Sequence, residues 1–249
     1  MVVKLSRADE LSHKSTAELK HQILELTKGR DIEPLNKKAL FYQNELSPLF
    51  EELSQRNPFP TPEEQEAVVL GVWTPVWSTI PFQDIFPGRI HDQSYQIFHS
   101  DGYYANIARY APGSKLSFLK ELSKRLLVYD FMVLQKFKVQ KGQWHIQNVG
   151  IEQAFRIRGV PLDIDKAESW FTAVVQSKLQ KNDSLEAPNL SNLDQSVVKK
   201  VEKTFLAIPQ LEHLYIDNDF RLIKTQREAK QRPSYTIAIR PLLTAYHGA

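Results

Sequence analysis

Charged side chains occupy every second position in the middle of the segment YIDNDFRLI, residues 215–223. If this segment is one regular β-strand, Asp217, Asp219 and Arg221 share a face, because successive side chains point to opposite sides. Two carboxylates ~7 Å apart beside an arginine can act as general acid and base. The same residues can instead form an ion-paired polar face or a clamp that fixes strand register. Both interpretations stay open, and we assign no catalytic residue.

Other motifs that carry chemistry are missing from the chain. It has no phosphate-binding glycine loop, no His-Glu-x-x-His helix and no Gly-x-Ser-x-Gly turn. There is no cysteine, which excludes a disulfide, a thiolate metal site and a cysteine nucleophile. His91 and His99 are eight residues apart on a predicted strand, ~26 Å if extended, and cannot share a metal. We expect no metal, no cofactor and no enzymatic activity, although folding could still assemble a Ser–His–Asp arrangement.

The composition is that of an ordinary globular protein. Of the 249 residues 42% are hydrophobic and 24% charged, and the formal net charge is +3, too weak for a nucleic-acid-binding protein. No apolar run approaches the ~18 residues of a membrane helix, so we expect any membrane contact to come from the water side. The first residues lack the apolar region of a signal peptide, and Asp9 and Glu10 argue against a transit peptide.

The first 60 residues predict helices. Ser15 with Glu18 forms a capping box that opens one helix, and Gly29 ends it. A second helix is expected over residues 35–45, and a third from Ser47 as N-cap with Pro48 at its first position. The segment NPFPTPEE then predicts a stiff, extended connector. We therefore divide the chain into a helical segment with linker, 1–60, and a β-domain, 61–249.

After Leu70 the hydrophobic period changes from 3.6 to 2, which predicts strands. Gly150 is expected to mark a β-bulge, and one late helix is expected over residues 194–206. About eight short strands predict a mainly β fold, an antiparallel barrel or sandwich, of which we favour the barrel. The strand candidates are VVLGVWTPVWST, DQSYQIFH, GYYANIARY, LLVYDFMVLQKFKVQ, QWHIQNVGIEQAFRIRG, AESWFTAVVQ, LYIDNDFRLIK and SYTIAIRP.

Four segments in a fixed order carry a resemblance. LFEELSQRNPFPTPEE, LGVWTPVWST, LYIDNDFRLIK and YTIAIR, within residues 19–240, resemble the plastid lipid-associated proteins, the PAP/fibrillin family. The resemblance implies a lipocalin-like barrel that binds a prenyl-lipid, quinone, carotenoid, tocopherol or fatty acid of photosynthetic membranes. It implies a place in the cytoplasm, at the thylakoid surface, or in a plastid. The chain departs from the family at Thr74–Trp77, where a Leu-Leu-Tyr-type run is usual.

The resemblance also implies how the barrel closes. In lipocalin-like barrels an arginine of the last strand stacks on a tryptophan of the first strand, and here the candidates are Arg240 and Trp73. Gly71 would leave room for the crossing chain. Alternation along the strands selects the candidate ligand wall, with the reservation that Pro75 could break the alternation in the first strand: Trp77, Tyr129, Phe131, Val133, Phe155 and Ile237.

Two basic clusters and the helical segment suggest partners. Lysines 115, 120 and 124 with Arg125 form one cluster, and Arg227, Lys230 and Arg232 form another. They are solvated faces or weak docking points for an anionic membrane surface. Besides a lipid-binding protein, two other functions stay open. One is a filled barrel that docks a membrane-associated protein through its N-terminal helices, and the other is a lipocalin-like enzyme acting on an isoprenoid or tetrapyrrole.

Overall fold

The computed structural model describes residues 7–81, 88–111, 127–181, 210–226 and 231–241. The helices are α1 (Arg7–Ser12), α2 (Thr16–Thr27), α3 (Leu35–Phe41), the π-turn η1 (Tyr42–Leu46), α4 (Ser47–Ser54), α5 (Pro62–Val69) and α7 (Ile164–Lys181). The strands are β1 (Gly71–Ser78), β2 (Arg89–Phe98), β3 (Tyr103–Tyr110), β4 (Leu127–Gln140), β5 (Gln143–Ile157), β6 (Gln210–Ile216), β7 (Phe220–Gln226) and β8 (Ser234–Ile239).

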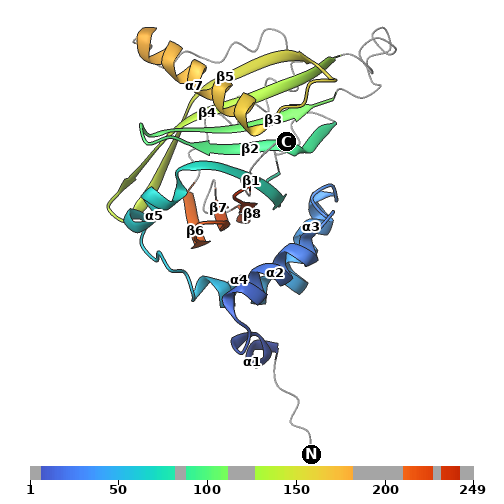
Figure 1. The fold of residues 1–249 in the computed structure, drawn as a ribbon. Helices are drawn as coiled ribbons and strands as arrows, with labels where there is room; N and C mark the ends of the chain where they lie inside the picture. The colour runs from blue at the N-terminus through green and yellow to red at the C-terminus, as the bar shows by residue number, and fades with distance from the viewer. Residues whose placement is uncertain (1–6, 82–87, 112–126, 182–209, 227–230, 242–249) are drawn as a thin grey trace, which may run out of the picture.

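The eight strands form one antiparallel sheet that closes into a ring. They follow one another in chain order, and β8 pairs with β1 to complete the ring. The longest pair, β4 and β5, carries a register shift next to Gly150, where the sequence predicts a bulge. The mainly β fold is therefore confirmed, with helices on two sides of the ring (Figure 1).

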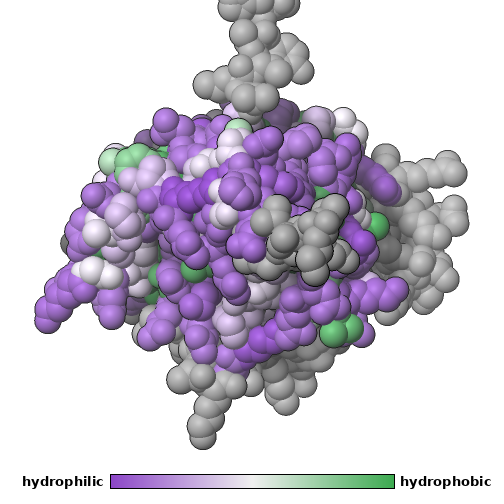
Figure 2. Space-filling model, turned by 90° about the horizontal axis from the view of Figure 1, so that it is seen from below, coloured by the Kyte–Doolittle hydropathy of each residue, from purple (hydrophilic) through white to green (hydrophobic). Residues whose placement is uncertain are grey.

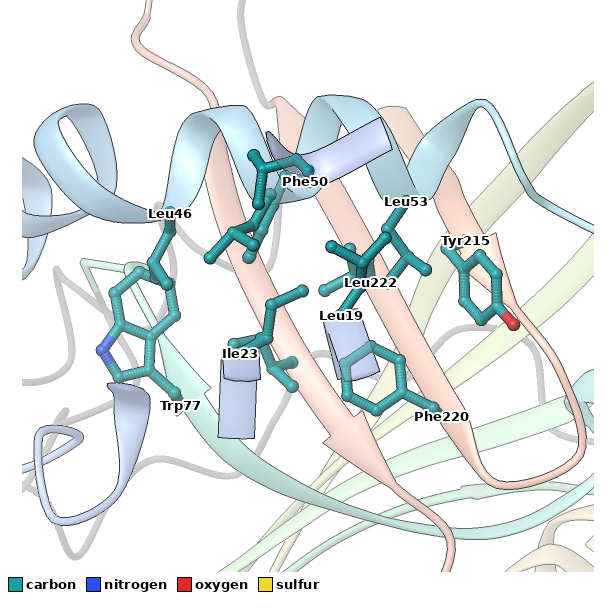
Figure 3. Packing of buried hydrophobic residues seen from close by; sticks show 12 residues of the cluster. Leu19, Ile23, Leu46, Phe50, Leu53, Trp77, Tyr215, Phe220 and Leu222 are labelled. Carbon is teal, nitrogen blue, oxygen red and sulfur yellow. The ribbon is translucent and has the colours of Figure 1, made fainter. Parts of the chain in front are cut away.

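The N-terminal helices pack against the outer face of β1 and β6–β8. Leu19, Ile23 and Phe50 enter one buried cluster with Trp77 and Leu222, as Figure 3 shows. All five side chains are at most 1% exposed. The helical segment therefore shares a hydrophobic core with the ring. The division of the chain at residue 60 stays a prediction.

The predicted capping box at the start of α2 is present. The Ser15 hydroxyl accepts from the Glu18 backbone, and the Glu18 carboxylate accepts from Ser15. The two helices predicted after it are one continuous helical stretch, residues 35–54. The residue before α4, Leu46, is itself in the α-helical region and makes no side-chain cap, so Ser47 is not the N-cap. The π-turn η1 joins the two parts, next to Pro48, which lacks a backbone donor.

The prediction of an extended connector was wrong over its second half. Thr61 and Glu64 form a second capping box, and Pro62 is the first residue of helix α5. Proline is well tolerated there, because the first helical N–H has no partner within the helix. Three nearby prolines obscured a capping signal that the letters TPEE contain.

The prediction that AESWFTAVVQ is a strand was also wrong, because this segment lies in helix α7. Its aromatic and β-branched content suggested a strand, but Ala167, Phe171 and Val175 recur every four residues, which is a helical period. These three side chains pack on the outer face of β2–β4, against residues such as Ile107 and Leu134. Helix α7 therefore covers the side of the ring away from the N-terminal helices (Figure 1).

LYIDNDFRLIK is a hairpin and not one strand. Strand β6 ends at Ile216 and β7 begins at Phe220. The Asp217 carboxylate accepts hydrogen bonds from the backbone of Asp219 (3.1 Å) and of Phe220 (2.9 Å). Such local bonds let aspartate stabilise a turn in place of a strand ladder.

Several predictions fall outside the described residues: the late helix 194–206, Lys115, Lys120, Lys124, Arg125, Arg227 and Lys230. Within the described ranges, no helix is long and apolar enough to cross a membrane. The face that carries α2–α4 is mostly hydrophilic, and its hydrophobic residues form small separate spots (Figure 2).

Candidate functional site: the interior of the ring

The ring encloses a cavity of about 230 Å³. Its apolar wall comes from side chains of β3–β7 that point inward, because alternate residues of each strand face the interior. Five of these apolar residues are Phe131, Val133, Ile146, Leu211 and Ile223. The cavity continues to Pro81 and Arg232, near the β1–β2 and β7–β8 connections.

A chain of amide and hydroxyl groups crosses one side of the cavity. The Asn106 Oδ1 atom accepts from Gln96 (3.0 Å) and from the Tyr104 hydroxyl (2.7 Å). Asn106 donates to Gln135 (2.7 Å), which donates to Asn148 (2.6 Å). Burial raises the pKa of Tyr104 to about 12, so it remains a neutral donor. The interior is therefore amphipathic, with an apolar wall facing a polar one.

Trp73 and Arg240 close one end of the ring. The guanidinium carbon of Arg240 lies 4.2 Å from the centre of the Trp73 ring, so the stacking that the resemblance implies is present. Arg240 also donates to the carbonyls of Val68, Leu70 and Asn218, at 2.7–2.9 Å. These bonds give the Arg240 guanidinium hydrogen-bond acceptors and connect the end of β8 to the residues just before β1.

Gly71 makes room for the Arg240 side chain. Its φ is +98°, a backbone conformation that residues other than glycine rarely adopt. A Cβ atom at this position would lie 2.8 Å from Arg240 Nη1. The crossing group that the glycine accommodates is therefore the arginine side chain itself.

Helix α5 covers the same end of the ring, and its Gln65 side chain is the centre of a buried hydrogen-bond network. Gln65 Nε2 donates to the Phe59 carbonyl (2.8 Å), which fixes its Oε1 atom toward Trp144 (3.0 Å) and His213 (3.1 Å). His213 must therefore donate through Nδ1, which leaves Nε2 as an acceptor. Burial and the nearby Arg221 charge hold the pKa of His213 well below its usual value, so the imidazole is neutral.

Arg221 is buried in the interior with no exposed surface. Its guanidinium carbon lies 4.9 Å from the Trp73 ring centre and 4.8 Å from that of Phe98. None of its three side-chain nitrogens has a hydrogen-bond partner within the described residues. Burial lowers the pKa of Arg221, yet a guanidinium remains a cation at neutral pH.

The predicted wall residues separate into two groups. Phe131 and Val133 line the cavity, and Tyr129 is buried beside Phe131, with ring centres 6.3 Å apart. Phe155 pairs with Tyr129 across β4 and β5 but is 69% exposed. At the end that carries Phe155, both β4 and β5 extend beyond the enclosed interior. Alternation along a strand shows which face a residue is on, but not where the interior ends.

Trp77 and Ile237 were wrongly placed in the ligand wall. Both face outward, into the cluster under the N-terminal helices, and the Trp77 ring centre lies 6.5 Å from that of Phe41. The register of β1 shifts between Pro75 and Trp77, and this irregularity reverses the alternation. In β8 the inward residues Thr236 and Ala238 are smaller or more polar than Ile237.

Asp217, Asp219 and Arg221 do not form one constellation. Both carboxylates accept from Lys20 of α2, with a Lys20–Asp217 distance of 2.8 Å, whereas Arg221 points into the cavity. Partial burial opposes ionisation of Asp217, but hydrogen bonds from Lys20 and Tyr215 outweigh it and lower its pKa. The acid–base interpretation is therefore wrong for these three residues, and the aspartates fasten α2 to the hairpin.

A second buried ionic group was missed in the sequence. Asp31, 6% exposed, accepts from the backbone of Ser78 (2.9 Å) and from His91 (2.7 Å), Arg89 (3.4 Å) and Lys38 (3.5 Å). Burial alone would raise the pKa of Asp31, but His91 and the two cations lower it. No local motif marks this contact, because its members come from distant segments.

The described residues contain no group of three or more His, Cys, Asp or Glu side chains that could hold a metal ion. Comparison with protein-family models, with curated proteins and with solved structures found no match to this chain. The geometry of the interior must therefore support any functional conclusion.

Proposed function

We propose that the ring is a lipocalin-like β-barrel that binds one hydrophobic small molecule in its interior. The observation that carries this proposal is the cavity of about 230 Å³ between the apolar wall, represented by Phe131, Val133 and Ile223, and the amide chain. Binding sites for small molecules are mostly apolar, with a few polar groups that fix orientation. An eight-stranded barrel is just wide enough to hold one small ligand.

The size of the cavity favours a slender ligand. Sites for drug-sized molecules measure ~300–1,000 Å³, and this cavity is smaller. It suits an acyl or prenyl chain, or one end of a larger molecule. Each methylene moved from water into the cavity contributes ~0.8 kcal/mol before the costs of ordering the ligand.

The resemblance to the plastid lipid-associated proteins supplies the ligand class. Within that class, prenyl-lipids, quinones, carotenoids and fatty acids each offer the chain that the cavity suits. On this proposal the protein is a non-enzymatic binding protein that works beside photosynthetic membranes, with the basic clusters making reversible contact with anionic headgroups.

A fluorescent probe tests the proposal. The neutral dye N-phenyl-1-naphthylamine should bind the protein at one site and brighten as it leaves water. Ala108 lines the cavity, so Ala108→Trp should fill the space and weaken binding at least tenfold. Ala17→Trp introduces the same ring at an exposed position of α2 and should bind like the wild type. Equal binding by all three proteins would refute an interior site.

One observation favours docking of a protein partner as a second function. Ile32, Leu35 and Leu40, in and just before α3, are 73%, 40% and 58% exposed. Removing residues 1–60 would also remove part of the core, so the better test is Leu40→Glu. This variant should lose crosslinks to a membrane-associated partner while dye binding is kept. Unchanged crosslinking would exclude this surface.

A further inference from the structure

Two arginines contact the same indole but are satisfied differently. Arg240 stacks on Trp73 and gives its N–H groups to three backbone carbonyls. Arg221 contacts the rings of Trp73 and Phe98, and its side-chain nitrogens meet no acceptor among the described residues. Buried donors are almost always paired in native proteins, so an orphaned guanidinium needs an explanation.

The cavity is the side from which a partner for Arg221 would come. The guanidinium carbon lies over the rings of Trp73 and Phe98, and the N–H groups that can donate hydrogen bonds lie in the guanidinium plane. Arg221 lines the cavity, so an acceptor for these N–H groups would come from the cavity side. Arg240 does not line the cavity. The unpaired donors thus belong to the proposed binding site and not to the closure of the ring.

The charge of the cavity points to an anion. Its described lining contains three arginines and no aspartate or glutamate. Arg89 is held by Asp31 and by the Ser94 hydroxyl (3.2 Å), and Arg232 donates to the Ala39 carbonyl (3.2 Å). A buried cation without a counter-charge is unfavourable, and a carboxylate matches the planar fork of a guanidinium with two parallel hydrogen bonds.

We propose that Arg221 binds the carboxylate of an amphipathic acid whose apolar chain lies along Phe131 and Val133. The proposal rests on the proposed function, since it names the ligand class within it. Arg221 is near the β6–β7 hairpin and the Trp73 closure, whereas Pro81 and Arg232 lie toward the other end of the strands. The acid therefore enters with its carboxylate first, and its chain extends toward the β1–β2 and β7–β8 connections.

Competition against N-phenyl-1-naphthylamine tests the carboxylate directly. Oleic acid and oleyl alcohol share the same chain and differ in the head group. Oleic acid should displace the dye from the wild type at a concentration at least tenfold lower than the alcohol. In Arg221→Met the two should displace it equally, and Arg221→Lys should restore part of the preference. Arg240→Met, the matched control, should keep the full preference.

The outcomes separate the two proposals. If both compounds displace the dye equally from the wild type, or if the preference persists in Arg221→Met, the carboxylate proposal is overturned and the hydrophobic site stands. If neither compound displaces the dye, both proposals fail. If inorganic phosphate binds in an Arg221-dependent manner and oleic acid does not, the site takes a free anion and the amphipathic acid is excluded.

A second measurement uses only the wild-type protein and needs no variant. Oleic acid labelled with ¹³C at the carboxyl group reports its own protonation by NMR. Bound to the wild type, the carboxyl group should stay ionised to a lower pH than in a neutral detergent micelle, because the guanidinium favours the anion. A titration equal to that in the micelle would contradict contact with Arg221.

Discussion

The outer face of the sheet under the N-terminal helices and its inner face differ in how their side chains are packed. Outside, the N-terminal helices cover β1 and β6–β8 with fully buried apolar side chains, as around Leu222 and Phe50. Inside, the same strands leave a cavity, a chain of amides and an unpaired cation. Unfilled volume and buried charge both lower stability. On our proposal, the outer face serves stability and the inner face binds the ligand.

The largest expected effect compares one phenylalanine from each face. Phe50, 1% exposed in the outer cluster, should cost about 3–5 kcal/mol of unfolding free energy when replaced by alanine. Phe131→Ala should cost less, about 1.5–3 kcal/mol, because Phe131 already borders empty space. Urea denaturation of both variants checks this order, and a larger loss for Phe131 would reverse the comparison.

The ionic contact between the helical segment and the ring should show a pH dependence. Asp31→Asn should lose about 1.5–3 kcal/mol at neutral pH, because Arg89, Lys38 and His91 lose a charged acceptor. The folded-state pKa of Asp31 lies below its ordinary value of 3.8. Its contribution is therefore complete above pH 3.8 and lost as the pH falls through the folded-state pKa. Urea denaturation from pH 7 to pH 2 should show wild type and variant converging, and a constant difference would exclude this role.

The closed end should be sensitive to one methyl group. Gly71→Ala should cost about 1–3 kcal/mol, because alanine meets both an unfavourable φ and the Arg240 guanidinium. In an Arg240→Met background the same substitution should cost less, since the clash is removed and the backbone strain remains. A double-mutant cycle measured by thermal unfolding gives the difference. If the effects of Gly71→Ala and Arg240→Met were strictly additive, the absence of a side chain at Gly71 would not be needed to accommodate Arg240.

The two arginines on Trp73 should differ in their contribution to stability. Arg240→Met should cost about 1.5–3 kcal/mol, because three carbonyls lose a charged donor. Without ligand, Arg221→Met should cost less than about 1 kcal/mol, since removing an unpaired buried cation offsets the lost ring contacts. Urea denaturation measures both. A loss for Arg221 as large as that for Arg240 would make it a structural residue.

Local patterns in the sequence predicted the fold well where one physical effect dominates. The Ser15–Glu18 capping box and the period-two strands are present. The Trp73–Arg240 stacking, which is also present, was implied by the family resemblance and not by a local pattern. Errors arose where two signals compete. The aspartates of the β6–β7 turn looked like one face of a strand, although Asp-Asn-Asp is also turn chemistry.

The candidate site in the interior was only partly predictable from the sequence. Phe131 and Val133 were found by alternation, whereas Trp77 was misplaced because a register shift reverses its side. Gln135, the one polar residue in an apolar row of β4, was the available sign of a polar interior wall. The isolation of Arg221 depends on which side chains surround it in space, and no spacing along the chain encodes that.

Native mass spectrometry tests the central claim, that the interior holds a ligand, most directly. The purified protein would be incubated with a total lipid extract of photosynthetic membranes, separated from unbound lipid and weighed intact. We expect the wild type and Ala17→Trp to carry one apolar molecule per chain, and Ala108→Trp to carry none. A wild type that stays at the mass of the bare chain, or an adduct that persists in Ala108→Trp, would contradict the account.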